Sequence, residues 1–318
     1  MQLHRFLFRA MAAENELQLW ADDASLAGRA ADAAMGDVLR IEAKYSRYRD
    51  DSMVTRINRA AGRQAVAIDG ETAALLAYAD RCHALSDGLF DITSGVLRRI
   101  WDFKRTPPAL PSPADIAQTL ALIDWASVEW SEHSIRLPVP RMEIDFGGIG
   151  KEYAADRAAT ICQEHGIAHG LVNLAGDIRI LGPNPDGTPW RIGIRQPRPY
   201  ANEGVAAIAG IDVSSGAIAT SGDYERYLEV DNRRYCHIMN PRTGWPVSHW
   251  RSITVLAPLC VVAGACATIA MLFESRAAAF LETQSVHWLG ISTDGASFGA
   301  GAGAADTPHP QAVQTTGA

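Results

Sequence analysis

The order in which helical and strand patterns follow one another is the feature that most constrains how this chain can fold. Helical spacing of apolar residues dominates the first part, and helices are expected at 22–44, 52–62 and 69–86, each opened by Asp or Ser side chains that can cap it. A proline-rich connection at 107–113 leads into another short helix, and from residue 127 onward the pattern changes to short strands. Helices first and strands afterwards predict an α+β fold with largely antiparallel sheets and argue against a doubly wound parallel sheet.

Short alternating segments bounded by Gly, Pro, Asn and Asp supply the strand candidates of the expected sheets. They are 6–20 with a break at 11–15, 127–137, 171–181, 190–196, 206–213, 217–221, 227–230 and 253–257. Asp231 and Asn232 predict a hairpin turn between two of the shorter strands. Helices are expected among these strands at 152–163 and, in a buried position, at 260–273.

The composition is that of an ordinary globular protein, with 47% hydrophobic and 20% charged residues in a chain of 318. A net charge of -7, with the Lys and Arg residues scattered, gives no basic surface for nucleic acid. We expect a single domain over 1–295, built as one body or as two intertwined lobes. A disordered tail is expected over 296–318, where Gly, Ala, Thr and Pro dominate.

The cysteines and the N-terminal region favour a reducing compartment. The chain has five Cys residues, whose spacings fit neither a disulfide framework nor a metal site, so buried free thiols are expected. Cys236, beside a histidine, is the one exception left open. No segment shows the length and apolarity of a membrane span, and the apolar run at 6–8 is too short for a signal peptide. A cytoplasmic protein without a membrane span is therefore expected.

The stretch Ile-Asp-Phe-Gly-Gly-Ile-Gly-Lys at 144–151 carries the strongest signal for chemistry. An acidic residue ends an apolar run, a glycine turn follows, and Lys151 stands where a helix begins. Glycines let backbone N–H groups approach a ligand and a helix N-terminus carries partial positive charge, so this turn can hold a phosphate. Its spacing matches neither the dinucleotide fingerprint nor the P-loop. Taken alone, the turn could equally be a tight connection that binds nothing.

A second cluster, Tyr-Cys-His-Ile-Met-Asn-Pro-Arg-Thr-Gly-Trp-Pro at 235–246, places His237 at the end of a short strand and before a turn. A histidine in that position can reach a cleft, and its ordinary pKa suits a general base near neutral pH. A histidine hydrogen-bonded within the turn is an equal alternative.

Three further clusters place polar side chains in loops. The segment at 217–226 leads from small and hydroxylated residues into Gly-Asp-Tyr, and suits either ligand contacts or an inner strand. Tyr48, between two arginines, suits either stacking on a flat ring or a cluster of ion pairs at a helix end. The glycine-bounded turn at 88–95 suits either ligand contacts or a plain loop in which Asp91 caps its own backbone.

Taken together, these clusters resemble the FAD:protein FMN transferase family, also called the ApbE family, over about residues 11–273. The motifs that carry the resemblance stand in family order and are Ser-Arg-Tyr, Gly-Leu-Phe-Asp-Ile-Thr, Asp-Phe-Gly-Gly-Ile-Gly-Lys, Asn-Leu-Ala-Gly-Asp-Ile, Thr-Ser-Gly-Asp-Tyr and His-Ile-Met-Asn-Pro-Arg-Thr-Gly. Each is weak alone, and their common order makes the resemblance specific. It implies a two-lobed, T-fold-like α+β architecture with a cleft for FAD.

The resemblance also implies a reaction. Family members cleave the pyrophosphate of FAD with the help of Mg²⁺, attach FMN through a phosphoester to a Thr or Ser of a target flavoprotein, and release AMP. Their targets carry an acidic residue shortly before a Ser/Thr-Gly-Ala run. The residues that the family pattern puts against FAD are Met11, Tyr48, Leu89, Phe90, Asp91, Asp145, Lys151 and Met239. His237 matches the histidine that activates the target hydroxyl.

The chain departs from the family pattern at the metal. The resemblance implies ligands from the late buried helix, an aspartate followed four residues on by a threonine, together with the backbone carbonyl of Gly148. Thr268 is present, but Gly264 stands at the aspartate position. The remaining ligands are neutral oxygens, whereas Mg²⁺ normally takes at least one carboxylate besides substrate phosphates. The carboxylates considered as substitutes are Asp145, Asp177 and Asp223.

Other functions are compatible with the same residues. The main alternatives to transfer are a FAD-binding protein with little transfer activity and a FAD pyrophosphatase that gives FMN and AMP. His237 favours transfer over binding alone, since binding requires no base at that place.

Overall fold

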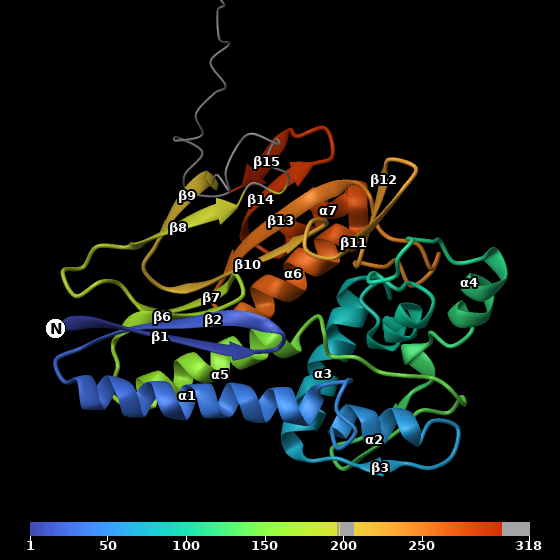
Figure 1. Ribbon diagram of the computed structural model, residues 1–318, viewed down its shortest axis with the longest axis horizontal. Coiled ribbons are helices and arrows are strands. Elements are labelled where there is room, and N and C mark those ends of the chain that lie inside the picture. Colours follow the sequence, from blue (N-terminus) through green and yellow to red (C-terminus); the bar gives the residue numbers. More distant parts are fainter. Residues whose placement is uncertain (196, 198–206, 301–318) are drawn as a thin grey trace, which may run out of the picture.

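A sheet of eight antiparallel strands forms the centre of the computed structural model, which describes residues 1–195, 197 and 207–300 (Figure 1). The strand order is β1-β2-β6-β7-β10-β13-β14-β15. These strands are β1 Gln2–Ala10, β2 Ala13–Ala21, β6 His169–Leu174, β7 Asp177–Gly182, β10 Gly216–Gly222, β13 Trp250–Ala257, β14 His287–Ser292 and β15 Ser297–Ala300. Every neighbouring pair runs antiparallel, which confirms the predicted α+β class.

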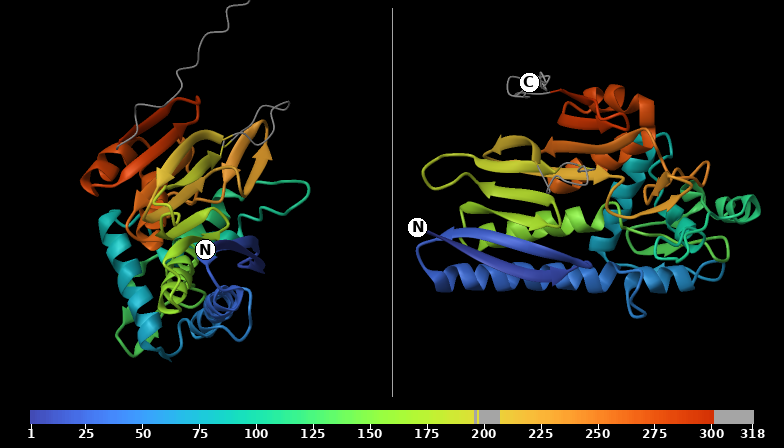
Figure 2. Two further views of the ribbon diagram at one scale, coloured as in Figure 1. Left: turned by 90° about the vertical axis from the view of Figure 1, so that its left-hand side faces the viewer. Right: turned by 45° about the horizontal axis from the view of Figure 1, so that its top comes forward.

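Helices cover one face of this sheet (Figure 2). The long helix α1, Ala24–Tyr45, packs on α5, Gly150–Glu164, and α5 packs in turn on α6, Cys260–Phe273. Buried alanines on α1 and α5 keep the helix surfaces narrow, so the helices can approach one another closely. A short helix, α7 Ala277–Thr283, follows α6 through the turn η3, Glu274–Arg276.

A separate hairpin covers part of the opposite face. It consists of β8, Trp190–Arg195, and β9, Ala207–Val213. The side chains of β6 show the two-faced pattern, because Leu171 packs in the cluster with β8 and β9 while Val172 packs toward the helices.

The remaining elements gather at one end of the large sheet (Figure 1). They are α2 Met53–Arg59, α3 Gly70–Leu85, η1 Ile92–Arg99, α4 Pro113–Leu120, η2 Trp125–Ser127, the sheet β3 Val66–Ala67, β5 Ser134–Arg136 and β4 Glu129–Trp130, and the hairpin β11 Tyr227–Val230 with β12 Arg233–Cys236. Trp101 is buried among them beside Leu97, Leu228 and Tyr235. Its indole N–H donates to the carbonyl oxygen of Gly244 at 2.9 Å. This contact ties the segment after η1 to the turn that follows His237.

Local sequence signals account for most element boundaries. The predicted caps are confirmed for α1, α2 and α3, where the side chains of Asp23, Ser52 and Asp69 accept backbone N–H groups of the first turn. The predicted hairpin turn is confirmed as well, since Asp231 and Asn232 take φ values of 52° and 57° between β11 and β12.

The structure corrects several sequence-based expectations near the C-terminus. Helix α7 and strand β14 were not predicted. The segment Ser297–Ala300, expected to belong to a disordered tail, pairs with β14 as the edge strand β15. All of its side chains are exposed, so it lacks the apolar alternation by which strands are predicted. The rest of that tail, 301–318, and residues 196 and 206 of two predicted strands lie outside the described residues.

A helical stretch of the described chain, Cys260–Thr283, is apolar and long enough to cross a membrane by composition, contrary to our expectation. Most of it is buried, and α6 packs against β10 and β13. Core packing therefore accounts for its apolar character.

Candidate functional site

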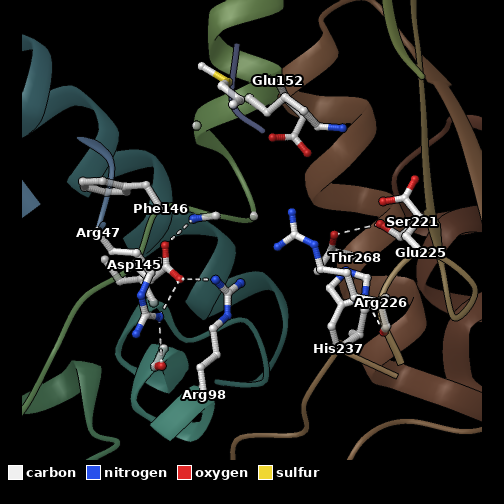
Figure 3. A pocket seen from close by; sticks show the side chains of 18 of the residues that line it. Arg47, Arg98, Asp145, Phe146, Glu152, Ser221, Glu225, Arg226, His237 and Thr268 are labelled. Atoms are coloured by element: carbon white, nitrogen blue, oxygen red, sulfur yellow. Dashed lines mark hydrogen bonds and ion pairs between the residues drawn. The ribbon is translucent and has the colours of Figure 1, made fainter. Parts of the chain in front are cut away.

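One cavity of about 430 Å³ brings together residues from distant parts of the chain (Figure 3). Its walls come from the β1–β2 turn, the end of α1, η1, the loop before α5, strand β10, the segment after β12, and α6. The residues that the sequence singled out for a site all line it, namely Met11, Tyr48, Leu89, Phe90, Asp91, Asp145, Gly148, Lys151, His237, Met239 and Thr268. The fold thus brings every predicted site residue to the walls of one cavity.

The glycine turn presents the start of α5 to this cavity. The Asp145 carboxylate accepts the Gly147 N–H at 2.9 Å, which fixes the turn. A Cβ added to Gly148 would lie 3.1 Å from the ring of Phe90, so a larger residue would displace this wall. Unlike the first turns of α1, α2 and α3, that of α5 has no side-chain cap from any residue that the structure describes. The positive end of the helix is therefore open toward the cavity.

Two arginines hold Asp145 in place. The Nη1 atoms of Arg47 and Arg98 each lie 3.1 Å from Oδ2 of Asp145. Arg47 also donates to the carbonyl oxygen of Gly95 at 3.1 Å. Asp145, which the resemblance puts against FAD, thus also holds the loop before α5 in place. Sequence reasoning missed Arg98, since nothing in the sequence of η1 indicates which side of that helix faces Asp145.

Asp91 holds its loop through hydrogen bonds, and Tyr48 exposes its ring at the cavity. Asp91 caps η1 by accepting the Thr93 N–H at 2.7 Å and also accepts the Trp125 N–H at 3.2 Å. The alternative of a self-capping carboxylate is therefore realised at the cavity wall. Tyr48 is 79% exposed, with the Arg47 guanidinium 5.9 Å from its ring centre, so one ring face is accessible to a ligand.

Lys151 lies at the cavity wall in an ion pair. Its Nζ is 2.7 Å from Oδ2 of Asp177, which stands at the start of β7. Burial disfavours the charge of Lys151, but the negative charge of Asp177 outweighs it and holds the pKa of Lys151 above its ordinary value. The lysine therefore stays cationic and can neutralise a bound phosphate.

The next residue, Glu152, is a buried carboxylate that sequence reasoning did not single out. Its side chain lines the cavity, the residue is only 7% exposed, and Oε2 has no hydrogen-bond partner within the described part of the chain. Burial first, and the charge of Asp177 next, raise the pKa of Glu152 above its ordinary value. Its position directly after Lys151 at a helix start was the available signal.

His237 faces the cavity with one ring nitrogen committed. Its Nδ1 lies 3.3 Å from the carbonyl oxygen of Arg226, and since a carbonyl can only accept, this bond puts the proton on Nδ1 and leaves the lone pair on Nε2. Burial, and then the positive charge of Arg226, lower the pKa of His237 to about 4. The imidazole is therefore neutral near pH 7 and can accept a proton.

Thr268 of α6 lies on the side of the cavity opposite Asp145 (Figure 3). Its hydroxyl and that of Ser221 in β10 are 2.9 Å apart (Figure 3). No group of three or more His, Cys, Asp and Glu side chains that could hold a metal ion occurs among the residues the structure describes. A cation here would thus depend on hydroxyl, carbonyl and substrate oxygens besides any single carboxylate.

Comparison with known proteins identifies the family. The family model described as the ApbE family matches residues 11–289. The chain belongs to the ApbE family. Among ApbE relatives, the FAD:protein FMN transferase of Vibrio cholerae is 32% identical over 247 residues, which cover 76% of this chain and 73% of that protein. The FAD:protein FMN transferase of Haemophilus influenzae is 30% identical over 264 residues, covering 80% and 76%.

Solved ApbE structures share the whole fold. The ApbE protein of Thermotoga maritima superposes with a TM-score of 0.85 at 31% identity, covering 93% of this chain and 96% of that one. The flavin transferase ApbE of Vibrio cholerae gives a TM-score of 0.80 at 27% identity, covering 94% and 98%. The ApbE-like α+β fold implied by the sequence motifs is thereby confirmed.

Proposed function

We infer that this chain is a FAD:protein FMN transferase that attaches FMN from FAD to a Thr or Ser of a target flavoprotein and releases AMP. The observation that carries the inference is that the start of α5, with Lys151, and the neutral His237 open onto the same cavity. One group binds phosphate charge, and the other accepts a proton. Both are needed to transfer a phosphoryl group to a hydroxyl.

Different residues assist the attack of the hydroxyl and stabilise the phosphate charge. The target hydroxyl oxygen attacks the phosphorus of the FMN half of the pyrophosphate, and the bond from this phosphorus to the oxygen retained by AMP breaks. Nε2 of His237 takes the hydroxyl proton. Lys151 and the backbone N–H groups of the glycine turn stabilise the phosphate charge, and Tyr48 offers a ring face for stacking.

Magnesium is part of this proposal. The candidate ligand atoms in the cavity are oxygens, which suit a hard cation, and the Thr268 hydroxyl and Gly148 carbonyl would contribute to holding it. When bound, Mg²⁺ neutralises charge on the phosphates. The buried Oε2 of Glu152 lines the same cavity and has no hydrogen-bond partner among the described residues, which supports a cation in this cavity.

The direct test is a mass measurement on a co-expressed flavoprotein subunit that carries an acidic residue before a Ser/Thr-Gly-Ala run. Transfer adds one FMN to the acceptor and releases AMP. Free FMN and AMP, with the acceptor unmodified, would establish a pyrophosphatase instead. If FAD is recovered intact in the presence of Mg²⁺ and acceptor, the chain is a FAD-binding protein without transfer activity.

A further inference from the structure

We propose that Glu152 is the carboxylate ligand of the divalent cation, reaching from α5 into the space that Gly264 leaves open on α6. The inference rests on the proposed function, because it concerns the Mg²⁺ that the transfer uses.

Glu152 and a side chain at position 264 would compete for the same space. A Cβ added to Gly264 would lie 2.5 Å from Cγ and 2.9 Å from Oε1 of Glu152, closer than real Cβ contacts. Gly264 lies inside α6 and has no positive φ, so its backbone does not require glycine, which is unfavourable within a helix. Room for the Glu152 side chain accounts for this glycine. Only one of the two helices can place a carboxylate here.

The surroundings of one Glu152 carboxylate oxygen also favour a cation. It is 7% exposed, and Oε2 accepts no hydrogen bond from any described residue. A buried carboxylate in that state is costly, and a bound cation removes the cost. In Figure 3 the carboxylate points into the cavity on the side where Thr268 and Ser221 lie. Gly148, Glu152 and Thr268 line that cavity together.

The other carboxylates considered as substitutes are less suited. Asp145 is held by two arginines at 3.1 Å each. Asp177 is paired with Lys151 at 2.7 Å. Asp223 lines a separate pocket with Arg234 and is not on the wall of the larger cavity. Among these acidic residues, Glu152 alone combines a place on the cavity wall with an oxygen that no described residue engages.

Binding of Mn²⁺ alone, followed by the paramagnetic resonance of the free ion, tests the assignment. We expect Glu152→Gln to weaken Mn²⁺ binding about tenfold or more, since a charged ligand is replaced by an amide. The double variant E152G/G264D returns a carboxylate to the same space from α6 and should restore most of the affinity. Glu225→Gln removes a charge from an exposed part of the same wall and should leave the affinity within about twofold of the wild type, which controls for the general loss of negative potential.

Thermal unfolding gives a second readout that needs no activity. Mg²⁺ should raise the melting temperature of the wild type and of E152G/G264D, but not that of Glu152→Gln. Glu152→Gln that binds Mn²⁺ as tightly as the wild type overturns the proposal. So does a folded E152G/G264D protein that binds no better than Glu152→Gln. FMN transfer measured on the wild type separates the two ideas. If the wild type transfers FMN but Glu152→Gln binds Mn²⁺ as tightly as the wild type, the assignment of Glu152 as a ligand is wrong and the proposed function stands. If Mn²⁺ binding changes as expected but the wild type transfers no FMN, the proposed function is wrong and the ligand assignment stands.

Discussion

At the scale of single residues, His237 illustrates how surroundings set chemistry. Burial first, and then the charge of Arg226, lower its pKa to about 4. The Arg226 carbonyl oxygen accepts a hydrogen bond from Nδ1–H. A free histidine would be partly cationic at pH 6. Here the imidazole keeps its Nε2 lone pair well into the acid range, which suits a proton acceptor.

The pH dependence of transfer follows from this lowered pKa. Because the folded-state pKa lies below the ordinary 6.5, His237 remains neutral as pH falls through 6.5 and becomes protonated only near pH 4. We expect the acid limb of kcat/KM for FMN transfer to lie below pH 5.5. A limb centred near 6.5, with the protein still folded by circular dichroism, would show that the active form holds an unperturbed histidine.

Replacement of His237 should separate transfer from binding. His237→Gln keeps an amide N–H that can donate to the Arg226 carbonyl but removes the base, so we expect transfer to fall about 10²–10⁴-fold. FAD affinity, measured by quenching of flavin fluorescence, should change little. His249→Gln, at an exposed histidine whose ring meets that of Trp250 edge-on, is the matched control and should transfer normally. Unimpaired transfer by His237→Gln would remove His237 from the mechanism.

Single residues also show what sequence could and could not predict. Asp145, Lys151 and His237 were found because they stand in short motifs with recognisable chemistry, and all of them line the cavity. Arg98 and Glu152 were missed because their roles depend on three-dimensional neighbours, Asp145 for the first and Gly264 for the second. Gly264 looked like a missing ligand until the structure showed which side chain fills its space.

At the scale of elements, α5 fixes the position of α6. Helix α6 has no cap from its own sequence. Instead Asp156 of α5 accepts the N–H groups of Cys260 and Val261 at 2.8 and 2.9 Å, and Arg179 of β7 lies 3.2 Å from the same carboxylate. The carboxylate compensates the positive end of α6. We call these contacts of Asp156 the Asp156 clamp. The clamp sets the register between α5, which carries Glu152, and α6, which carries Thr268.

Loss of the clamp should destabilise the whole protein. We expect Asp156→Ala to lower the free energy of unfolding by about 1–3 kcal/mol, because it leaves two N–H groups and an arginine without their acceptor. Denaturant unfolding measures the change. Asp51→Ala is a control, since that carboxylate pairs with Arg49 at 3.0 Å but is 71% exposed, so its loss should leave the free energy of unfolding nearly unchanged. Equal stability of Asp156→Ala and wild type would mean that α6 needs no cap.

The clamp also explains why element prediction succeeded only in part. Helices with their own caps, such as α1 with Asp23, were predicted from local sequence, and α6 was predicted from its unbroken apolar run. Helix α7 and strand β15 carry no such local signal, because α7 has no side-chain cap and β15 exposes all its side chains. Their structure comes from packing on α6 and pairing with β14.

At the scale of the whole molecule, the cavity lies where the large sheet and its helices meet the elements gathered at one end. Tyr48, Phe90 and Asp145 come from the first half of the sequence, and His237 and Thr268 from the second. The antiparallel fold class could be predicted from the order of patterns. The meeting of these segments could not, because it depends on long-range pairing such as that of Trp101 with Gly244. A ligand that contacts both parts should therefore stabilise the molecule as a unit.

Binding of FAD without metal tests this view of the cavity. At a FAD concentration 100 times its Kd, mass action stabilises the folded state by about 2.7 kcal/mol, which raises the melting temperature by several degrees in a protein of this size. The contacts proposed between FAD and the rings of Tyr48 and Phe90, and the charge of Lys151, do not depend on the cation. We therefore expect FAD in EDTA to retain much of this shift, although more FAD is needed, while FMN transfer stops. Addition of Mg²⁺ should restore transfer. A complete loss of the FAD-induced shift in EDTA would instead mean that the cation, and not the walls of the cavity, holds the nucleotide.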